Sequence, residues 1–114
     1  MPQRRALLAN ARRHLKRGGT LLLSASGASE DVNEKYRQAY EQDRATTGEW
    51  RSYVSRGANG EVLYMTHHFE EKELELLLSE AGFAGICMQK ELEHSSRRPE
   101  EEAVFLYVTA EASP

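Results

Sequence analysis

The chain has 114 residues, 29% of them charged and 39% hydrophobic, and this composition suits one small globular α/β domain. Its formal net charge of −3 gives no overall attraction to nucleic acid, and the lone Cys87 excludes an internal disulfide. No apolar run approaches the roughly 18 residues that span a bilayer, and no secretory signal follows the basic N-terminus, so we expect a cytoplasmic protein without a membrane partner.

A helix over 2–17 and a strand over 20–25 are the first elements that the sequence predicts. The helix would bury a face made of Leu7, Leu8, Ala11 and Leu15, which fall at helical spacing. Gly18 and Gly19 can end the helix and reverse the chain. Because residues 20–23 form a short apolar run, we expect a strand covered on both faces.

The middle of the chain reads as a helix over 32–46 followed by a hairpin over 50–66. Asp31 is the predicted N-cap of the helix. Asn59 and Gly60 form a strong turn signal between two strand-like runs. The aromatic and polar character of this hairpin is typical of a flap rather than of a core.

A third helix is predicted over 71–81 and two final strands over 85–92 and 103–109. Phe69 and Leu74 stand at hydrophobic-staple positions, and Glu73 stands at N3. The buried face of this helix would consist of Leu74, Leu77, Leu78 and Ala81. We expect Cys87 to be a small buried side chain.

This order of elements resembles the C-terminal half of a class I S-adenosylmethionine-dependent methyltransferase. The matching segments are LKRGGTLLL at 15–23, HFEEKELELLL at 68–78 and AGF at 81–83. The resemblance implies a partial Rossmann-like sheet of three C-terminal strands, the last two antiparallel, with flanking helices and a β-hairpin flap. The strand at 103–109 would lie between those at 20–25 and 85–92.

The sequence departs from the family in two ways. Arg17 stands where the family usually has proline before the two glycines. More importantly, the glycine-rich loop and the acidic residue that hold S-adenosylmethionine in the family have no counterpart, since the glycines at 57–60 belong to a hairpin turn. The family implies this cofactor, yet the sequence offers no cofactor-binding residue, and a shortened gene product or an isolated fragment would explain the pattern.

Four residues are candidates for the substrate side: Ser24, Ser26, Tyr64 and His68. The two serines lie at the carboxyl end of the first strand, where ligands bind in open α/β sheets. Tyr64 on the hairpin could cover a substrate, or it could simply pack the flap with Trp50 and Tyr53. His68 resembles a recurrent family histidine, and its alternative role is packing where the third helix begins.

No catalytic residue or metal site follows from the sequence. His67 and His68 are adjacent, so on an extended chain they point to opposite sides and are poorly placed to share a metal. The polar, cationic segment 94–99 could meet a phosphate or a carboxylate, although a solvated loop is the simpler interpretation.

Three hypotheses for function remain open. In the first, the chain is a methyltransferase fragment with substrate-side elements, expected to be inactive alone and to act on a small molecule rather than RNA. In the second, it is a non-catalytic module that pairs with another polypeptide. In the third, it binds RNA through its first helix, since residues 1–20 hold six Lys and Arg and no acid. The strand at 20–25 would leave an apolar edge open to self-association or to a partner.

Overall fold

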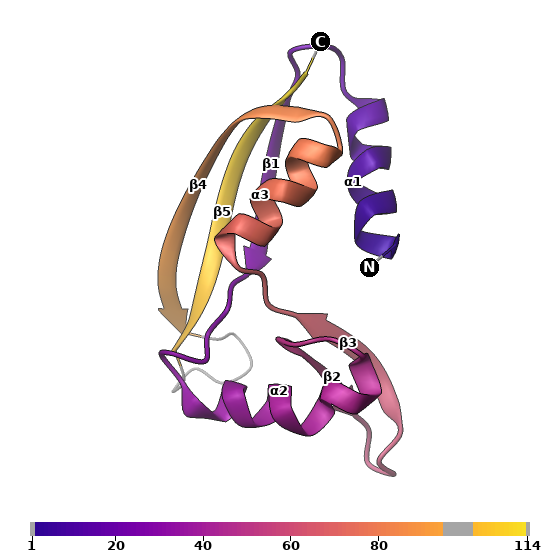
Figure 1. Cartoon of the computed structure of the whole chain (residues 1–114), viewed down its shortest axis with the longest axis vertical. Coiled ribbons are helices and arrows are strands. Elements are labelled where there is room, and N and C mark those ends of the chain that lie inside the picture. The colour runs from indigo at the N-terminus through magenta and orange to yellow at the C-terminus, as the bar shows by residue number, and fades with distance from the viewer. Residues whose placement is uncertain (1, 95–101, 114) are drawn as a thin grey trace. The chain divides into compact units, whose positions relative to one another are not determined.

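The computed structural model describes residues 2–94 and 102–113. The elements, in chain order, are α1 (Pro2–His14), β1 (Thr20–Ser26), α2 (Glu34–Thr47), β2 (Ser52–Arg56), β3 (Val62–His67), α3 (Glu71–Glu80), β4 (Phe83–His94) and β5 (Glu102–Ala112). One sheet has the strand order β1-β5-β4, and β5 runs antiparallel to both neighbours (Figure 1). The predicted order of the three strands is therefore confirmed, and β2 and β3 form a separate two-stranded sheet.

The chain divides into two compact units rather than one. Unit 1 consists of Met1–Ala25, Glu70–Glu91 and Leu106–Pro114, and unit 2 consists of Ser26–Phe69 and Leu92–Phe105. Each unit is described by itself below.

In unit 1 a glycine bulge connects α1 to β1. Gly18 has φ of 80°, and its N–H donates to the Ala112 oxygen at 3.0 Å. The Ala112 N–H in turn donates to the Gly19 oxygen at 2.8 Å, so two residues face one, with glycine in the left-handed position. Helix α1 ends at His14, before the predicted end at Arg17, because the next residues form turns, including a bond from the Gly19 N–H to the Lys16 oxygen at 2.7 Å.

The register of β1 against β5 follows from the hydrogen bonds at its two ends. Gly19 bonds to Ala112, and the Gly27 N–H donates to the Val104 oxygen at 2.8 Å. The number of residues between these two bonded pairs is the same in both strands. The backbone N–H and C=O groups of residues 21, 23 and 25 therefore point toward β5. Residues 20, 22 and 24 then present their backbone groups to the other edge of β1.

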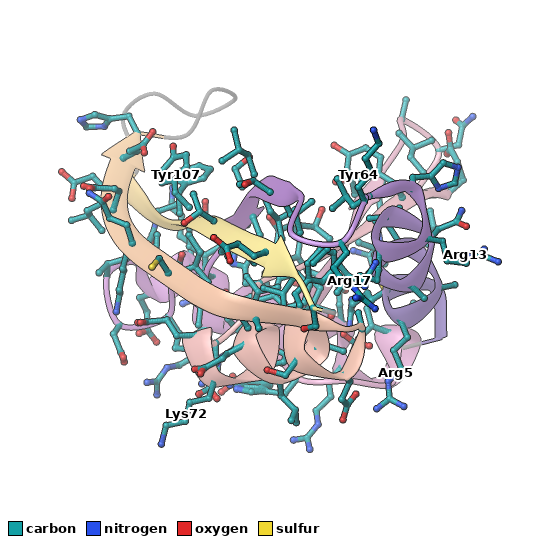
Figure 2. The ribbon with its side chains drawn as sticks, turned by 90° about the horizontal axis from the view of Figure 1, so that it is seen from above. Arg5, Arg13, Arg17, Tyr64, Lys72 and Tyr107 are labelled. Carbon is teal, nitrogen blue, oxygen red and sulfur yellow. The ribbon has the colours of Figure 1, made fainter. Side chains whose placement is uncertain are left out.

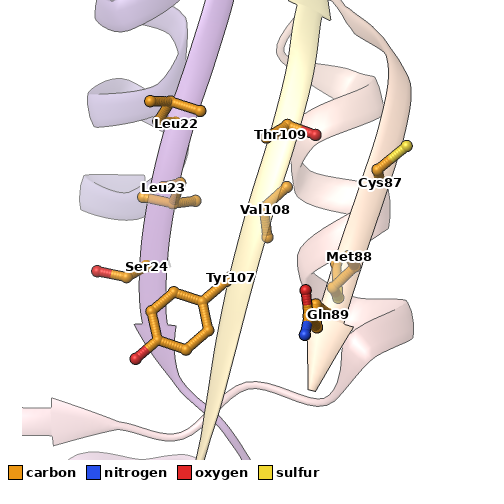
Figure 3. Close-up of a pocket in the computed structure, with 9 residues that line it drawn as sticks. All are labelled: Leu22, Leu23, Ser24, Cys87, Met88, Gln89, Tyr107, Val108 and Thr109. Atoms are coloured by element: carbon orange, nitrogen blue, oxygen red, sulfur yellow. The ribbon is translucent and has the colours of Figure 1, made fainter. Parts of the chain in front are cut away.

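Only one face of the sheet in unit 1 is covered by helices. Helices α1 and α3 lie behind the sheet, and the alternate residues Leu22, Ser24, Tyr107 and Thr109 are exposed on its open face (Figure 3). Leu22 is 75% exposed, which corrects the expectation of a strand covered on both faces. Cys87 is also exposed rather than buried, because it alternates outward along β4.

The core of unit 1 lies between its helices and the inner face of β5. Leu8, Leu74 and Leu78 are buried, together with the inward residues of β5. Leu7, which was expected in this core, is 69% exposed, because the face of α1 that turns inward carries Leu8 and the half-buried Ala11, Arg12 and Leu15. Leu77 and Ala81 are only half-buried, since they lie at the rim of the buried face of α3.

Arg12 ties the first helix to the turn after α3. Its Nε donates to the Gly82 oxygen at 3.1 Å, and its Nη2 donates to the Ser113 oxygen. Gly82 has φ of 98°, and a Cβ there would lie 3.3 Å from the Arg12 side chain. This position therefore requires glycine for its backbone angle and for the close approach of Arg12.

In unit 2, Asn33 rather than the predicted Asp31 caps α2. The Asn33 side chain accepts a hydrogen bond from the Lys35 N–H at 3.1 Å. The Val32 and Asn33 N–H groups both donate to the Ser29 oxygen, so a turn occupies the residues where the helix was expected to begin. The helix ends at Gly48, which has φ of 77°.

Strands β2 and β3 pair antiparallel, from Ser52 opposite His67 to Arg56 opposite Val62, with a bulge between Ser55 and Arg56. Gly60, at φ 79°, closes the turn, and its N–H donates to the Gly57 oxygen at 3.0 Å.

Helix α3 begins after Glu70, whose N–H donates to the Glu73 carboxylate at 3.3 Å as in a capping box. The strands β4 and β5 extend beyond the predicted ranges 85–92 and 103–109. Of the predicted cationic segment 94–99, residues 95–99 lie outside the described residues.

Candidate functional site

A cluster of aromatic rings around His68 forms the centre of unit 2. Helix α2 supplies Tyr36 and Tyr40 one helical turn apart, β2 supplies Tyr53, and Trp50 precedes β2. The rings of these three tyrosines lie 5.0 to 5.6 Å from the His68 ring, and Trp50 lies 5.5 Å from Tyr40. His68 is 3% exposed and Tyr40 is fully buried, so the cluster is the core of this unit.

Two tyrosine hydroxyls hold the nitrogens of His68. The Tyr40 hydroxyl lies 2.5 Å from Nδ1, and the Tyr53 hydroxyl lies 3.3 Å from Nε2. The Tyr40 oxygen also accepts the Ser29 N–H at 3.4 Å. Ser29 is buried and extends the network, because its Oγ accepts the Val104 N–H at 2.9 Å and donates to the Gly27 oxygen at 2.8 Å.

Burial sets the protonation state of this network. Loss of solvation, together with a smaller effect of the nearby His67, lowers the pKa of His68 from 6.5 to about 4. Burial also raises the pKa of Tyr40 far above its ordinary value. At neutral pH the network therefore consists of a neutral imidazole between neutral phenols, and no member of it is a ready proton acceptor.

Beside the aromatic cluster lies a groove of about 600 Å³ between α2 and the β2–β3 hairpin. Because Tyr53 pairs with Thr66 and Ser55 pairs with Tyr64, these four side chains share one face of the hairpin. The residues that line the groove are Lys35, Tyr36, Ala39, Gln42, Asp43, Tyr53, Val54, Ser55, Arg56, Tyr64 and Thr66. The lining is rich in hydroxyl groups and aromatic rings.

An ion pair closes one part of this groove. Asp43 is 3% exposed, and its carboxylate accepts the Val54 N–H at 3.0 Å and pairs with Arg56 at 2.8 Å. The bond from Arg56 holds the pKa of Asp43 below its ordinary value. Asp43 thus covers the outer edge of β2 and neutralises Arg56.

A second cluster of polar side chains does not form a nucleophilic triad. It consists of Ser52, His67 and Glu49. The Ser52 hydroxyl lies 2.6 Å from His67 Nδ1, and the Glu49 carboxylate lies 2.7 Å from the same nitrogen. In a serine nucleophile triad the serine and the acid use opposite ring nitrogens. Since Ser52 is also fully buried, this cluster links the start of β2 to the end of β3.

The four predicted substrate-side residues do not meet in one site. Ser24 is exposed in unit 1, on the open face beside Tyr107 (Figure 3). Ser26 is half-buried in unit 2, and its oxygen accepts the Phe69 N–H at 2.9 Å. Tyr64 lines the groove, whereas His68 lies behind it and contacts two of the lining residues, Tyr36 and Tyr53.

Tyr40, the most buried partner of His68, was not found from the sequence. Its hydrogen bond to His68 joins residues 28 positions apart, and it becomes visible only in the folded chain. Among residues 2–94 and 102–113, no group of three His, Cys, Asp or Glu side chains could hold a metal ion. None of the helices described is long and apolar enough to cross a membrane.

Comparisons with protein-family models and with curated proteins give no match for this sequence. Solved structures do match. A SAM-dependent methyltransferase from Methanosarcina mazei is similar with a TM-score of 0.86 and 26% identity over 98% of this chain and 52% of that one. A SAM-dependent methyltransferase from Thermotoga maritima, described as a possible histamine N-methyltransferase, matches with a TM-score of 0.53 and 21% identity over 96% of this chain and 49% of that one. The chain thus resembles SAM-dependent methyltransferases, as its sequence indicated, and spans about half the length of these two.

The loop after β1 does not fit the role of a cofactor loop. The Gly27 N–H donates to the Val104 oxygen, the Ala28 N–H donates to the Phe69 oxygen, and the Ser29 N–H donates to the Tyr40 hydroxyl. These three backbone N–H groups are therefore engaged within the protein, whereas a glycine-rich loop holds a cofactor with unused backbone N–H groups. The other connection from a strand to a helix, at residues 68–70, contains no glycine.

Proposed function

We propose that this chain supplies the acceptor-binding half of a SAM-dependent methyltransferase, and that another polypeptide segment supplies the residues that bind the cofactor. The observation that carries the proposal is the match of 98% of this chain to 52% of the Methanosarcina mazei methyltransferase, at a TM-score of 0.86. The loop after β1 supports the proposal, because the N–H groups of Gly27, Ala28 and Ser29 are engaged within the protein and are not presented to a cofactor.

Two features support a contribution on the acceptor side. The groove beside α2 is large enough for a small molecule and carries tyrosine hydroxyls. Strand β1 lies at an edge of its sheet, and residues 20, 22 and 24 present backbone groups there that a further strand could pair. The methyl group would come from the cofactor held by the other segment, and this chain would bind and orient the acceptor.

The alternative is a non-catalytic module that pairs with another polypeptide. It would use the same edge of β1 and would differ only in having no methyltransferase activity. Binding of RNA through α1 is less well supported. Arg12 is engaged by two carbonyl oxygens of unit 1, and Arg5 lies 3.9 Å from Glu80. Arg5 and Arg13 do project outward from α1 (Figure 2), but two such side chains form no base-stacking platform.

Calorimetric titration with S-adenosylmethionine tests the proposal. The chain alone is expected to show no micromolar binding. A fusion to the half of the Methanosarcina mazei enzyme that this chain does not cover is expected to bind the cofactor. Micromolar binding by the chain alone would contradict the proposal, and so would a folded fusion that fails to bind although the intact Methanosarcina mazei enzyme binds.

A further inference from the structure

Asn59 and Gly60 lie in the turn of the β2–β3 hairpin, and both are exposed. The Gly60 N–H donates to the Gly57 oxygen at 3.0 Å, and the Gly57 N–H donates to the Glu61 oxygen at 2.9 Å. Gly60 has φ of 79°, an angle that glycine adopts without strain. The turn thus places the backbone nitrogen of a glycine directly after an exposed asparagine.

The side chain of an asparagine can react with the backbone nitrogen of the next residue. That nitrogen loses its proton to hydroxide or water and attacks the Cγ carbon, a five-membered succinimide ring closes, and the amide nitrogen takes up a proton and leaves as ammonia. Water then opens either carbonyl of the ring, which gives aspartate or an isoaspartate whose main chain runs through the side chain. One water is consumed and one ammonia is released. Glycine favours the attack because it has no Cβ to hinder the approach.

The Glu61 carboxylate holds the turn in a form that opposes this reaction. Its Oε2 accepts the Asn59 N–H at 3.0 Å, and a Cβ on Gly57 would overlap the same carboxylate, so the carboxylate lies against the turn. Because the attacking Gly60 nitrogen must lose its proton, its hydrogen bond to Gly57 has to open first. The nearby negative charge also disfavours the anion that forms. The reaction therefore takes place in the fraction of chains in which the turn is open.

We propose that Asn59 is a site of spontaneous deamidation, and that Glu61 sets the rate by holding the turn closed. The product carries a new carboxylate close to that of Glu61, and like charges placed together weaken the turn. In the isoaspartate form the main chain gains one methylene between residues 59 and 60, next to the pair of Arg56 and Val62. Modification therefore loosens the hairpin that lines the groove of unit 2. It requires neither cofactor nor acceptor, so it is independent of the proposed function.

The two other asparagines of the chain serve as internal controls. Asn10 lies inside α1, and Asn33 caps α2 and precedes the larger Glu34. The folded chain is incubated at mildly alkaline pH, and mass spectrometry of its peptides follows conversion at each asparagine while the released ammonia is measured. Asn59 is expected to convert at least about tenfold faster than either control, because only its neighbour leaves the approach open. Equal rates at the three asparagines would overturn the proposal.

Substitutions test the role of Glu61. Glu61→Ala removes the carboxylate from the turn and should raise the rate at Asn59 about two- to fivefold, as expected for one exposed hydrogen bond to a charged group. Glu41→Ala removes the same charge from an exposed position on α2, and this matched control should leave the rate unchanged. An unchanged rate in Glu61→Ala, or an equal increase in Glu41→Ala, would overturn the role assigned to Glu61.

Unfolding distinguishes the effect of the turn from that of the local sequence. In concentrated urea the parent chain and Glu61→Ala should convert at Asn59 at the same rate, and faster than the folded parent, because the turn no longer holds the Gly60 nitrogen. A difference between the two chains that persists in urea would contradict control by the folded turn.

The effect of modification on the hairpin is measured on the separated product. The aspartate form has one negative charge more than the parent, whose formal net charge is −3, so ion exchange separates the two. Hydrogen exchange of the Gly57 amide, which is bonded to the Glu61 oxygen, should be about two- to fivefold faster in the product, because the added charge favours opening of the turn. Unchanged exchange in the product would show that modification leaves the hairpin as it was, and it would overturn that part of the proposal.

Discussion

At the scale of single residues, buried and half-buried polar side chains connect separate segments of the chain by hydrogen bonds. His68 is held neutral between two tyrosines, Asp43 covers the edge of β2, and Arg12 joins α1 to the turn at Gly82. Each of these groups is satisfied by a partner far along the chain, which is what makes burial of a polar group tolerable. The partners could not be predicted from local sequence patterns.

The neutral state of His68 gives the protein a pH-dependent stability. Its pKa is about 4 in the folded chain against 6.5 ordinarily, so between these values the unfolded chain binds a proton that the folded chain does not. Stability should therefore be full above pH 6.5 and fall by up to about 3 kcal/mol as the pH drops to 4.

Urea unfolding at several pH values between 7 and 4.5 measures this slope. His68→Gln should flatten it, even though the variant is less stable throughout. The range stops above the ordinary pKa of Asp43, whose carboxylate would add a loss of the same sign at lower pH. If the slope of the variant matched that of the parent, protonation of His68 would not be the cause.

At the scale of elements, the sequence predicted the helices and strands of the described residues, and the resemblance to methyltransferases implied the order of strands in the sheet. Periodicity, glycine turns and the Asn59–Gly60 signal were sufficient for the elements, because they depend on neighbours in the chain. The positions of helix ends and the exposure of Leu7, Leu22 and Cys87 were missed. Those depend on which faces other elements cover, and a strand of three leucines looks the same whether one face or both are covered.

Helix α3 offers a matched pair of leucines for testing how it packs. Leu78 is fully buried and Leu76 is 60% exposed, two residues apart on the same helix. Leu78→Asp would place an unpaired charge in the core of unit 1 and should cost on the order of 4 kcal/mol or more, enough to unfold a small domain. Leu76→Asp should change the free energy of unfolding by only about 0.5 kcal/mol.

Circular dichroism during urea unfolding distinguishes the two leucine variants. The expected result is an unfolded or strongly destabilised Leu78 variant and a near-normal Leu76 variant. Equal effects at the two positions would mean that α3 does not bury the face described here.

At the scale of the whole molecule, the chain contains a three-stranded sheet and resembles part of a SAM-dependent methyltransferase. It matches about half of its structural relatives. In the described residues, β1 has β5 on one side and, at its far end, only the bridge from Gly27 to Phe69 on the other. The proposed function therefore requires that β1 is an edge that accepts another strand.

Sedimentation velocity over a range of protein concentrations tests this edge most directly, with two variants at one position. Leu22→Pro removes an N–H that faces the edge and leaves the bonds to β5 in place, whereas Leu22→Thr removes the exposed apolar side chain and keeps that N–H. We expect the parent chain and Leu22→Thr to show a mass that rises with concentration, and Leu22→Pro to remain a monomer. A parent chain that stays monomeric at high concentration would contradict the account, because the edge would then be covered, and equal association by all three chains would show that they associate elsewhere.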